Sequence, residues 1–263
     1  MGKGNNTQPG GAPGFFPPPE KSGVCLISHP DKPCEDRYFL SDNLAAVIDG
    51  MGGYQGGAEV AQGAVDKLSQ IQDQPRQEGW TMQAILQMRE DLLASQAGKA
   101  NACLTLAWRD GQRIEVAWCG DCRAYLIDAA GELHLLTEDH SSWQKELPKD
   151  LVEDARLALD QCDSKQQAME LHGRHAAHAW QRRNSVSSAL ALGPIEMISG
   201  DLEPGDRVLL CSDGVHDNLS QEQIRLCLAQ EGDAAENLGR AAFEASFSSS
   251  GRAKPDDICC LVF

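Results

Sequence analysis

The spacing of apolar residues divides the first half of the chain into strands and helices. Two short apolar runs, at residues 38–40 and 44–48, are separated by a polar triplet and predict two strands joined by a turn. Apolar residues three and four positions apart predict helices over residues 58–71 and 81–97, the second with Thr81 as its N-cap. The globular part therefore begins with two strands that are followed by two helices.

A β-rich region follows. Apolar runs at residues 103–108 and 113–119 flank an Asp-Gly pair at 110–111, which predicts a β-hairpin. The runs at residues 123–128 and 132–136 flank a turn that ends in glycine and predict a second hairpin. Hairpins with paired helices between them predict antiparallel sheets that are covered by helices.

The second half of the chain interrupts this β pattern and then resumes it. Residues 141–185 are polar and charged, and we expect them to form an inserted flap of two helical pieces. The remaining predicted elements are a buried strand, a helix capped by Ser220, a second helix and a C-terminal strand, at 207–211, 221–230, 234–247 and 258–263.

Length and composition limit the number of domains. The chain has 263 residues, which suits one large domain or two small ones, and 41% of them are hydrophobic, which is enough for a substantial core. Residues 1–22 are rich in Gly and Pro, and we interpret them as a disordered arm, with a short partner-binding motif as the alternative. Residues 23–263 are then a single domain that carries the flap.

The charge of the chain excludes some partners. Asp and Glu number 39 against 23 Lys and Arg, a net charge of −16, and so acidic a surface repels nucleic acid. No secretory leader is visible, and no apolar run reaches the roughly 18 residues of a membrane span. We expect a cytoplasmic monomer that binds neither nucleic acid nor a membrane. Half of the 10 cysteines lie in apolar runs and are interpreted as small hydrophobic residues: Cys103, Cys119, Cys211, Cys259 and Cys260.

Acidic residues recur beside the apolar strands. Asp49 and Asp213 each follow a strand and precede a glycine, and Asp256 precedes the C-terminal strand. The pair Glu35-Asp36 precedes the first strand. An Asp-Gly pair on its own is most simply a turn. The recurrence at strand ends favours a site for divalent cations, because gathered carboxylates repel one another unless cations lie between them.

The order of these motifs resembles the PPM family of metal-dependent Ser/Thr phosphatases, the protein phosphatase 2C type. The matching segments span roughly residues 24–263 and are Glu35-Asp36-Arg37, residues 49–53 (Asp-Gly-Met-Gly-Gly), 120–125, 136–141, 191–193, 204–206, 212–214 with Asp217, and 256–258. Each motif is weak by itself, whereas the ordered series is specific.

The resemblance implies an α+β fold, a four-layer α-β-β-α sandwich of two antiparallel sheets flanked by helices. It also implies two Mn²⁺ or Mg²⁺ ions, held by Glu35, Asp36, Asp49, Gly50, Asp213 and Asp256. Asp49 would bridge both ions, and Asp121 and Asp217 match positions that hold a third ion in some members.

The activity implied by the resemblance is hydrolysis of phosphoserine and phosphothreonine in proteins that are substrates of a Ser/Thr kinase pathway. A water between the two ions, held through Asp49 and Asp213, would attack phosphorus directly.

One departure from the family pattern leaves an alternative open. The arginine that usually binds the substrate phosphate, four residues before Glu35, is Asp31 here, and Lys32 is the nearby candidate to replace it. The Asn101–Cys103 run is also altered. The alternative function is therefore a phosphatase-like metal-binding regulatory module with little or no turnover.

Two further patterns have simpler explanations. Cys119 and Cys122 form a C-x-x-C motif, but the chain continues as a strand and not as the helix that a redox pair needs. His172, His175 and His178 recur every third residue and could present ligands on one helix face, although a solvated helix is the interpretation we favour.

Overall fold

The computed structural model describes residues 21–27, 33–52, 56–95 and 100–263. Nearly all of the predicted N-terminal arm, residues 1–20, lies outside the described residues.

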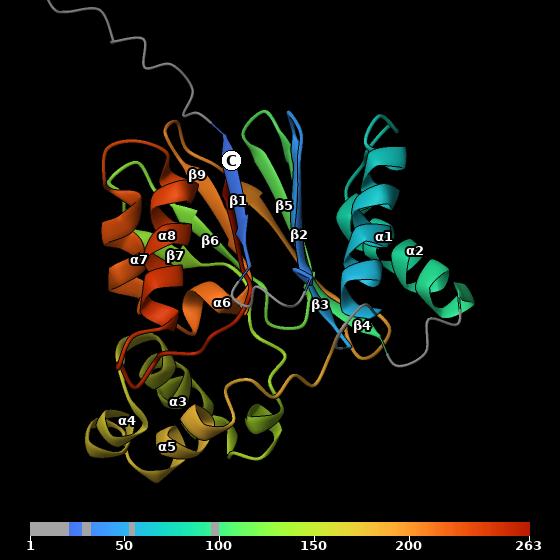
Figure 1. The fold of residues 1–263 in the computed structure, drawn as a ribbon. Helices are drawn as coiled ribbons and strands as arrows, with labels where there is room; N and C mark the ends of the chain where they lie inside the picture. The colour runs from blue at the N-terminus through green and yellow to red at the C-terminus, as the bar shows by residue number, and fades with distance from the viewer. Residues whose placement is uncertain (1–20, 28–32, 53–55, 96–99) are drawn as a thin grey trace, which may run out of the picture.

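Two antiparallel sheets of five strands each lie face to face (Figure 1). The first sheet has the order β1-β10-β9-β6-β7, with bounds Ser22–Leu26, Ile258–Val262, Arg207–Cys211, Arg123–Ile127 and Leu133–Leu135. The second has the order β2-β3-β4-β5-β8, with bounds Asp36–Leu40, Leu44–Met51, Asn101–Asp110, Arg113–Cys119 and Glu196–Asp201.

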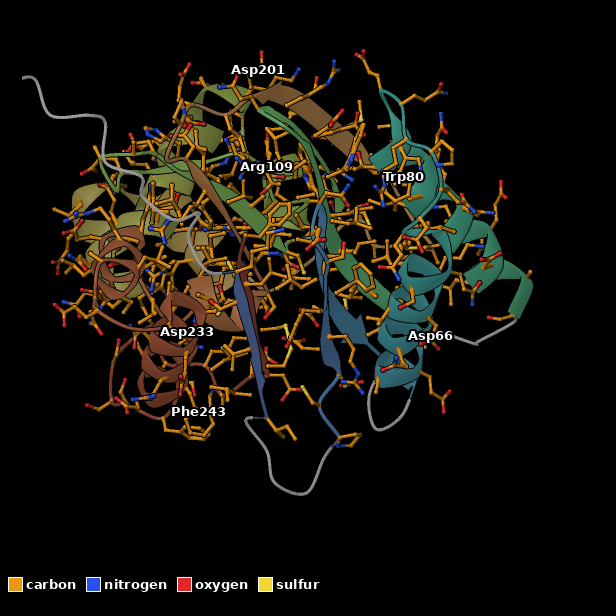
Figure 2. The ribbon with its side chains drawn as sticks, turned by 90° about the horizontal axis from the view of Figure 1, so that it is seen from above. Asp66, Trp80, Arg109, Asp201, Asp233 and Phe243 are labelled. Atoms are coloured by element: carbon orange, nitrogen blue, oxygen red, sulfur yellow. A yellow bond between two sulfur atoms is a disulfide. The ribbon has the colours of Figure 1, made fainter. Side chains whose placement is uncertain are left out.

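Helices cover the outer face of each sheet. Helices α1 (Gly56–Ile71) and α2 (Trp80–Ser95) lie on the second sheet. Helices α6 (Asp213–His216), α7 (Gln221–Leu228) and α8 (Ala234–Ser246) lie on the first. Seen from above, Asp66 on α1 and Phe243 on α8 lie at opposite sides of the molecule (Figure 2). The predicted four-layer α+β sandwich is confirmed.

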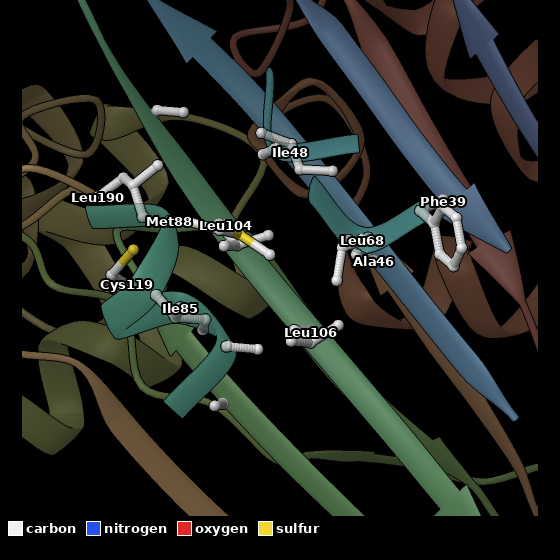
Figure 3. Close-up of a cluster of buried hydrophobic side chains, with 14 of the residues drawn as sticks. Phe39, Ala46, Ile48, Leu68, Ile85, Met88, Leu104, Leu106, Cys119 and Leu190 are labelled. Atoms are coloured by element: carbon white, nitrogen blue, oxygen red, sulfur yellow. The ribbon is translucent and has the colours of Figure 1, made fainter. Parts of the chain in front are cut away.

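The continuous apolar runs of the central strands follow from this layering, because both faces of each sheet are buried. In β3, Ala46 and Ile48 face α1 and α2, whereas Ala45 and Val47 face the other sheet. Figure 3 shows the helix side of this core, where Leu104 of β4 lies among side chains of β3, α1 and α2.

The inserted segment forms a separate helical lobe below the sandwich (Figure 1). It contains a 3₁₀ helix and three α-helices, at Ser142–Lys145, Lys149–Gln161 (α3), Lys165–Leu171 (α4) and Arg174–Gln181 (α5). Trp143 and Trp180 lie in its own small core. The prediction of two helical pieces was wrong because Ser164 caps α4 and Gly173, with φ of 95°, separates α4 from α5.

The N-cap predicted for α2 was also wrong. The helix begins at Trp80, and the buried carboxylate of Glu115 in β5 binds its first turn. Glu115 accepts hydrogen bonds from the Gly79 amide at 2.7 Å, the Thr81 amide at 2.8 Å and the Thr81 hydroxyl at 2.6 Å. A strand therefore supplies the helix cap.

Strands β1 and β8 lacked a prediction. β8 is an edge strand of mostly exposed residues, so its sequence has little apolar pattern. β1 is an edge strand paired with β10, and Cys25 forms a disulfide with Cys259 directly opposite it. Cys259 lies in the hydrophobic core as predicted, but its disulfide with Cys25 was not predicted. Within the described residues, no helix combines the length and apolar character needed to cross a membrane.

Candidate metal centre

Two of the predicted acidic residues lie directly opposite each other on one sheet. Asp36, at the start of β2, pairs in register with Asp49 of β3. Asp49 lies inside β3, which continues to Met51, and not in a loop after the strand as the sequence had suggested. Side chains of directly opposed residues share one face of a sheet. Both carboxylates are therefore brought together by strand pairing.

Gly50 allows the backbone of Glu35 and Gly57 to lie very close to β3 beside these carboxylates. Its amide donates to the Glu35 carbonyl at 3.2 Å. A Cβ at this position would lie 2.3 Å from the Gly57 carbonyl oxygen and 2.7 Å from the Glu35 carbonyl oxygen. Only glycine fits such an approach, which explains the glycine in this motif.

Asp213 and Asp256 come from the other sheet. Asp213 opens α6 directly after β9, and Asp256 lies just before β10, the strand paired with β9. A Cβ on Gly214 would lie 2.0 Å from the Asp257 carbonyl oxygen, so the two loops are in close contact. The Asp257 carboxylate accepts a hydrogen bond from the Glu35 amide at 2.7 Å. This bond joins the loop before β10 to the residue that precedes Asp36.

The carboxylates raise one another's pKa. Burial raises the pKa of Asp36 and Asp49 well above the usual range, and the negative charge of Asp213 adds to the effect on both. Burial and Asp213 also raise the pKa of Asp121 to about 8. Asp36 is only 2% exposed, and its Oδ2 atom has no hydrogen-bond partner within the described chain. Among the residues that the structure describes, none forms an ion pair with Asp36 or Asp49.

The other end of the cluster holds a cation that the sequence reasoning missed. The Lys254 ammonium contacts carboxylate oxygens of Asp213 at 2.5 Å, Asp256 at 2.9 Å and Asp217 at 3.0 Å. Burial opposes the charge of Lys254, but the three carboxylates outweigh it and raise its pKa. Its place two residues before Asp256 was the only signal in the sequence.

Asp217 lies near a second cationic side chain, Arg183, and near His216, whose pKa is lowered by burial. The Arg183 Nε atom and the His216 Nδ1 atom are each 3.8 Å from its Oδ1 atom. Burial would raise the pKa of Asp217, but Lys254, His216 and Arg183 lower it overall. Asp217 is therefore already neutralised by side chains.

The donor set has the chemistry of a divalent-metal site. Aspartate oxygens are the ligands that Mn²⁺ and Mg²⁺ prefer, and the buried Oδ2 atom of Asp36 and the mutual repulsion call for a cation. As the side chains lie in the described residues, however, no three His, Cys, Asp or Glu are arranged around a common metal position. Lys254 instead occupies oxygens of Asp213 and Asp256.

The predicted phosphate-binding residue lies in a segment that precedes the described strand β2. Asp31 and Lys32 lie outside the described residues. The role of Lys32 therefore stays a prediction.

The other sequence patterns lie apart from this centre or inside the core. Cys119 and Cys122 are free and buried, and burial raises the pKa of the Cys119 thiol to about 12, which opposes redox reactivity. His172 and His175 both bind the Asp154 carboxylate, at 2.8 and 2.6 Å.

The layered fold and the paired carboxylates agree with a comparison to protein families, in which one family model matches most of the chain. Residues 28–242 match the family model described as Protein phosphatase 2C. The chain belongs to this family. The resemblance inferred from the ordered motifs is confirmed.

Relatives within the protein phosphatase 2C family share the fold and part of the sequence. The serine/threonine protein phosphatase PstP of Mycobacterium tuberculosis is 27% identical over 243 residues, 87% of this chain but 41% of the relative. The chain thus spans about two-fifths of the length of that curated relative.

Solved structures show the same architecture. The crystal structure of M. tuberculosis PstP/Ppp has a TM-score of 0.72 at 23% identity and covers 92% of this chain and 97% of the other. The PstP catalytic domain in complex with two manganese ions has a TM-score of 0.73 at 22% identity, with 92% and 96% covered. PppA of Pseudomonas aeruginosa has a TM-score of 0.66 at 22% identity, with the same coverage.

Proposed function

We propose that this chain is a metal-dependent phosphatase that hydrolyses phosphoserine and phosphothreonine in proteins. One observation supports the proposal: Asp36 and Asp49 are paired on one sheet, and the negative charges of Asp213 and Asp256, beside the strands of the other sheet, add to the effect of burial in raising the pKa of both. Family membership supports the reaction class, and the name of the PstP relative supports the substrate class.

The proposed ligands follow from the sequence match and from the strand pairing. Asp49 would contact both ions, the Gly50 carbonyl one of them, and Asp213 and Asp256 the other, with Glu35 and Asp36 acting directly or through water. Bound Mn²⁺ or Mg²⁺ would supply a water of lowered pKa as nucleophile and neutralise charge on the phosphate. A third ion at Asp121 and Asp217, a preference for one metal, the cytoplasmic location and the monomeric state stay predictions.

Ser212 lies behind the carboxylates. Burial raises the pKa of Asp36, and the fully buried Ser212 hydroxyl partly offsets that rise. The same hydroxyl accepts the Cys259 amide at 3.0 Å, and the Ser212 amide donates to the Cys259 carbonyl at 2.9 Å. Ser212 is thereby held against Cys259, with its hydroxyl close enough to Asp36 to affect the pKa of that carboxyl group.

A phosphatase assay on the purified chain tests the proposal. We expect Mn²⁺ to stimulate hydrolysis of p-nitrophenyl phosphate and of phosphopeptides, and Asp49→Asn and Asp213→Asn each to lower kcat by at least a thousandfold. Asp66→Asn, which removes an exposed carboxylate on α1, is the matched control and should leave the rate unchanged. Wild-type hydrolysis that survives complete chelation of metal would contradict the proposal.

The second candidate is a phosphatase-like regulatory module, favoured by Asp31 in place of the usual phosphate-binding arginine. It predicts metal binding by calorimetry without hydrolysis. Asp31→Arg discriminates between the two, since a large rise in rate identifies a catalytic scaffold that lacks only its phosphate-binding cation. A wild-type chain that already turns over rapidly excludes the module.

A further inference from the structure

Lys254 reaches into the acidic cluster from the loop before β10. Its side chain is 19% exposed, and its ammonium lies within 3.0 Å of oxygens from three carboxylates. Two of these, Asp213 and Asp256, are proposed metal ligands. An ammonium at this position has the same electrostatic role as a metal ion, with one positive charge in place of two.

We propose that Lys254 is a tethered cation that competes with divalent metal for Asp213 and Asp256, so that metal binding must displace its ammonium. This inference rests on the proposed metal site. It makes Lys254 a residue that sets metal affinity, and with it the metal concentration at which the site fills.

Hydrogen bonds fix the backbone of Lys254, whereas its long side chain is held only through the ammonium group. The Lys254 amide donates to the Asn218 side-chain oxygen at 2.7 Å, and the Asn218 side-chain amide donates to the Lys254 carbonyl at 2.9 Å. The same Asn218 nitrogen donates to the Gly214 carbonyl at 2.8 Å. The loop is therefore held by its backbone, and four rotatable carbon–carbon bonds can carry the ammonium away without disturbing it.

Displacement of the Lys254 ammonium would affect the three carboxylates that it contacts unequally. Asp217 keeps Arg183 and His216 nearby after the ammonium leaves. Asp213 is only 9% exposed and, apart from Lys254, has no ion-pair partner within the described residues. Asp256, with a 41% exposed side chain, is likewise paired only with Lys254 among the described residues. A divalent ion therefore gains most at Asp213 and Asp256, and we expect the ammonium to remain near Asp217.

The test compares Mn²⁺ binding by the wild type and by Lys254→Gln, using calorimetry and thermal unfolding, neither of which needs activity. The variant lacks the internal cation, so we expect a lower Tm than wild type in chelator. We expect it to bind Mn²⁺ with a Kd at least tenfold lower, and to gain more in Tm on Mn²⁺ addition. Lys254→Arg keeps the charge and should remain near wild type in Kd.

A matched control is Lys67→Gln, which removes a lysine of similar exposure that pairs with Asp91 at 2.8 Å on the far helical layer. Its Mn²⁺ Kd should equal that of the wild type. If Lys254→Gln does not fold in chelator, Lys254→Met repeats the test, and the Mn²⁺ concentration at half-maximal folding replaces the Kd.

The outcomes separate this inference from the proposed function. Equal or weaker Mn²⁺ binding by Lys254→Gln overturns the competition while leaving the phosphatase proposal intact if the wild type binds Mn²⁺. If neither protein binds Mn²⁺ or Mg²⁺, both proposals fail. Tighter binding by the variant supports the competition whether or not the wild type hydrolyses phosphopeptides.

Discussion

Asp36 and Asp49 lie directly opposite each other on β2 and β3, so that two carboxylates share one face of the sheet. Like charges in such a pair are destabilising, and burial adds to the cost because it raises the pKa of both groups. The metal-free fold therefore carries a local penalty that a bound cation would relieve.

Asp36→Asn should therefore stabilise the protein in chelator at alkaline pH, by about 1 kcal/mol on the scale of cross-strand pairs. The same variant should gain less stability than wild type on addition of Mn²⁺, because a carboxylate ligand is lost. Urea denaturation with and without Mn²⁺ measures both effects. A variant that is less stable than wild type in chelator would show that Asp36 is not under repulsion.

Substitution of two glycines tests whether backbone atoms crowd Gly50. One glycine has backbone atoms close to its Cβ position, and the other has open space there. Gly50→Ala places a Cβ 2.3 Å from a backbone oxygen, and we expect a loss of more than about 2 kcal/mol in the free energy of unfolding. Gly63 lies inside α1 with no atom within 4 Å of its Cβ position. Gly63→Ala should instead stabilise by roughly 0.5–1 kcal/mol, because alanine favours the helix. Equal effects of the two substitutions would contradict this account of Gly50.

The stability of the metal-free protein should fall as pH rises from about 4 to about 8. The pKa of Asp121 is raised from 3.8 to about 8, so across this interval the folded state binds a proton that the unfolded state has released. Each such proton contributes a slope of about −1.4 kcal/mol per pH unit. Chemical denaturation in chelator at several pH values measures it.

Asp121→Asn should flatten this pH dependence, whereas Asp66→Asn, an exposed control, should leave the slope unchanged. A slope that is the same in wild type and Asp121→Asn would show that Asp121 does not titrate in this range.

Arg252 connects the helical lobe to the site. The buried guanidinium donates to the carbonyls of Leu159 at 2.9 Å and His216 at 2.8 Å, and also to the carbonyl of Cys162. Arg252→Gln should cost about 3 kcal/mol, because buried acceptors lose charged donors. Hydrogen exchange should accelerate most over residues 149–181.

Arg240→Gln is the control for this prediction, since Arg240 forms an exposed pair with Glu236 and should cost less than about 0.5 kcal/mol. Uniform acceleration of exchange across the sandwich in Arg252→Gln would mean that Arg252 supports the whole fold and not the lobe in particular.

The elements predicted from sequence are of two kinds. Some are strands whose residues are buried all along their length, and others are helices that begin with a local cap. The apolar run of β3 predicted a strand because both of its faces are buried, and Ser220 with Gln223 forms the capping box that begins α7. The ordered acidic motifs predicted the family, because the order of motifs along the chain can be read without knowing where Asp49, Asp213 and Asp256 lie in space.

Contacts between residues far apart in the chain were decided only by the tertiary structure. Glu115 caps α2 from a neighbouring strand, and Cys25 meets Cys259 across 234 residues of sequence. Apart from its place two residues before Asp256, Lys254 gave no local signal, because a lysine acquires such a role only where folding brings three carboxylates around it. The sequence by itself thus determined which residues carry negative charge towards the site, and the packing of the two sheets determined which cation already balances that charge.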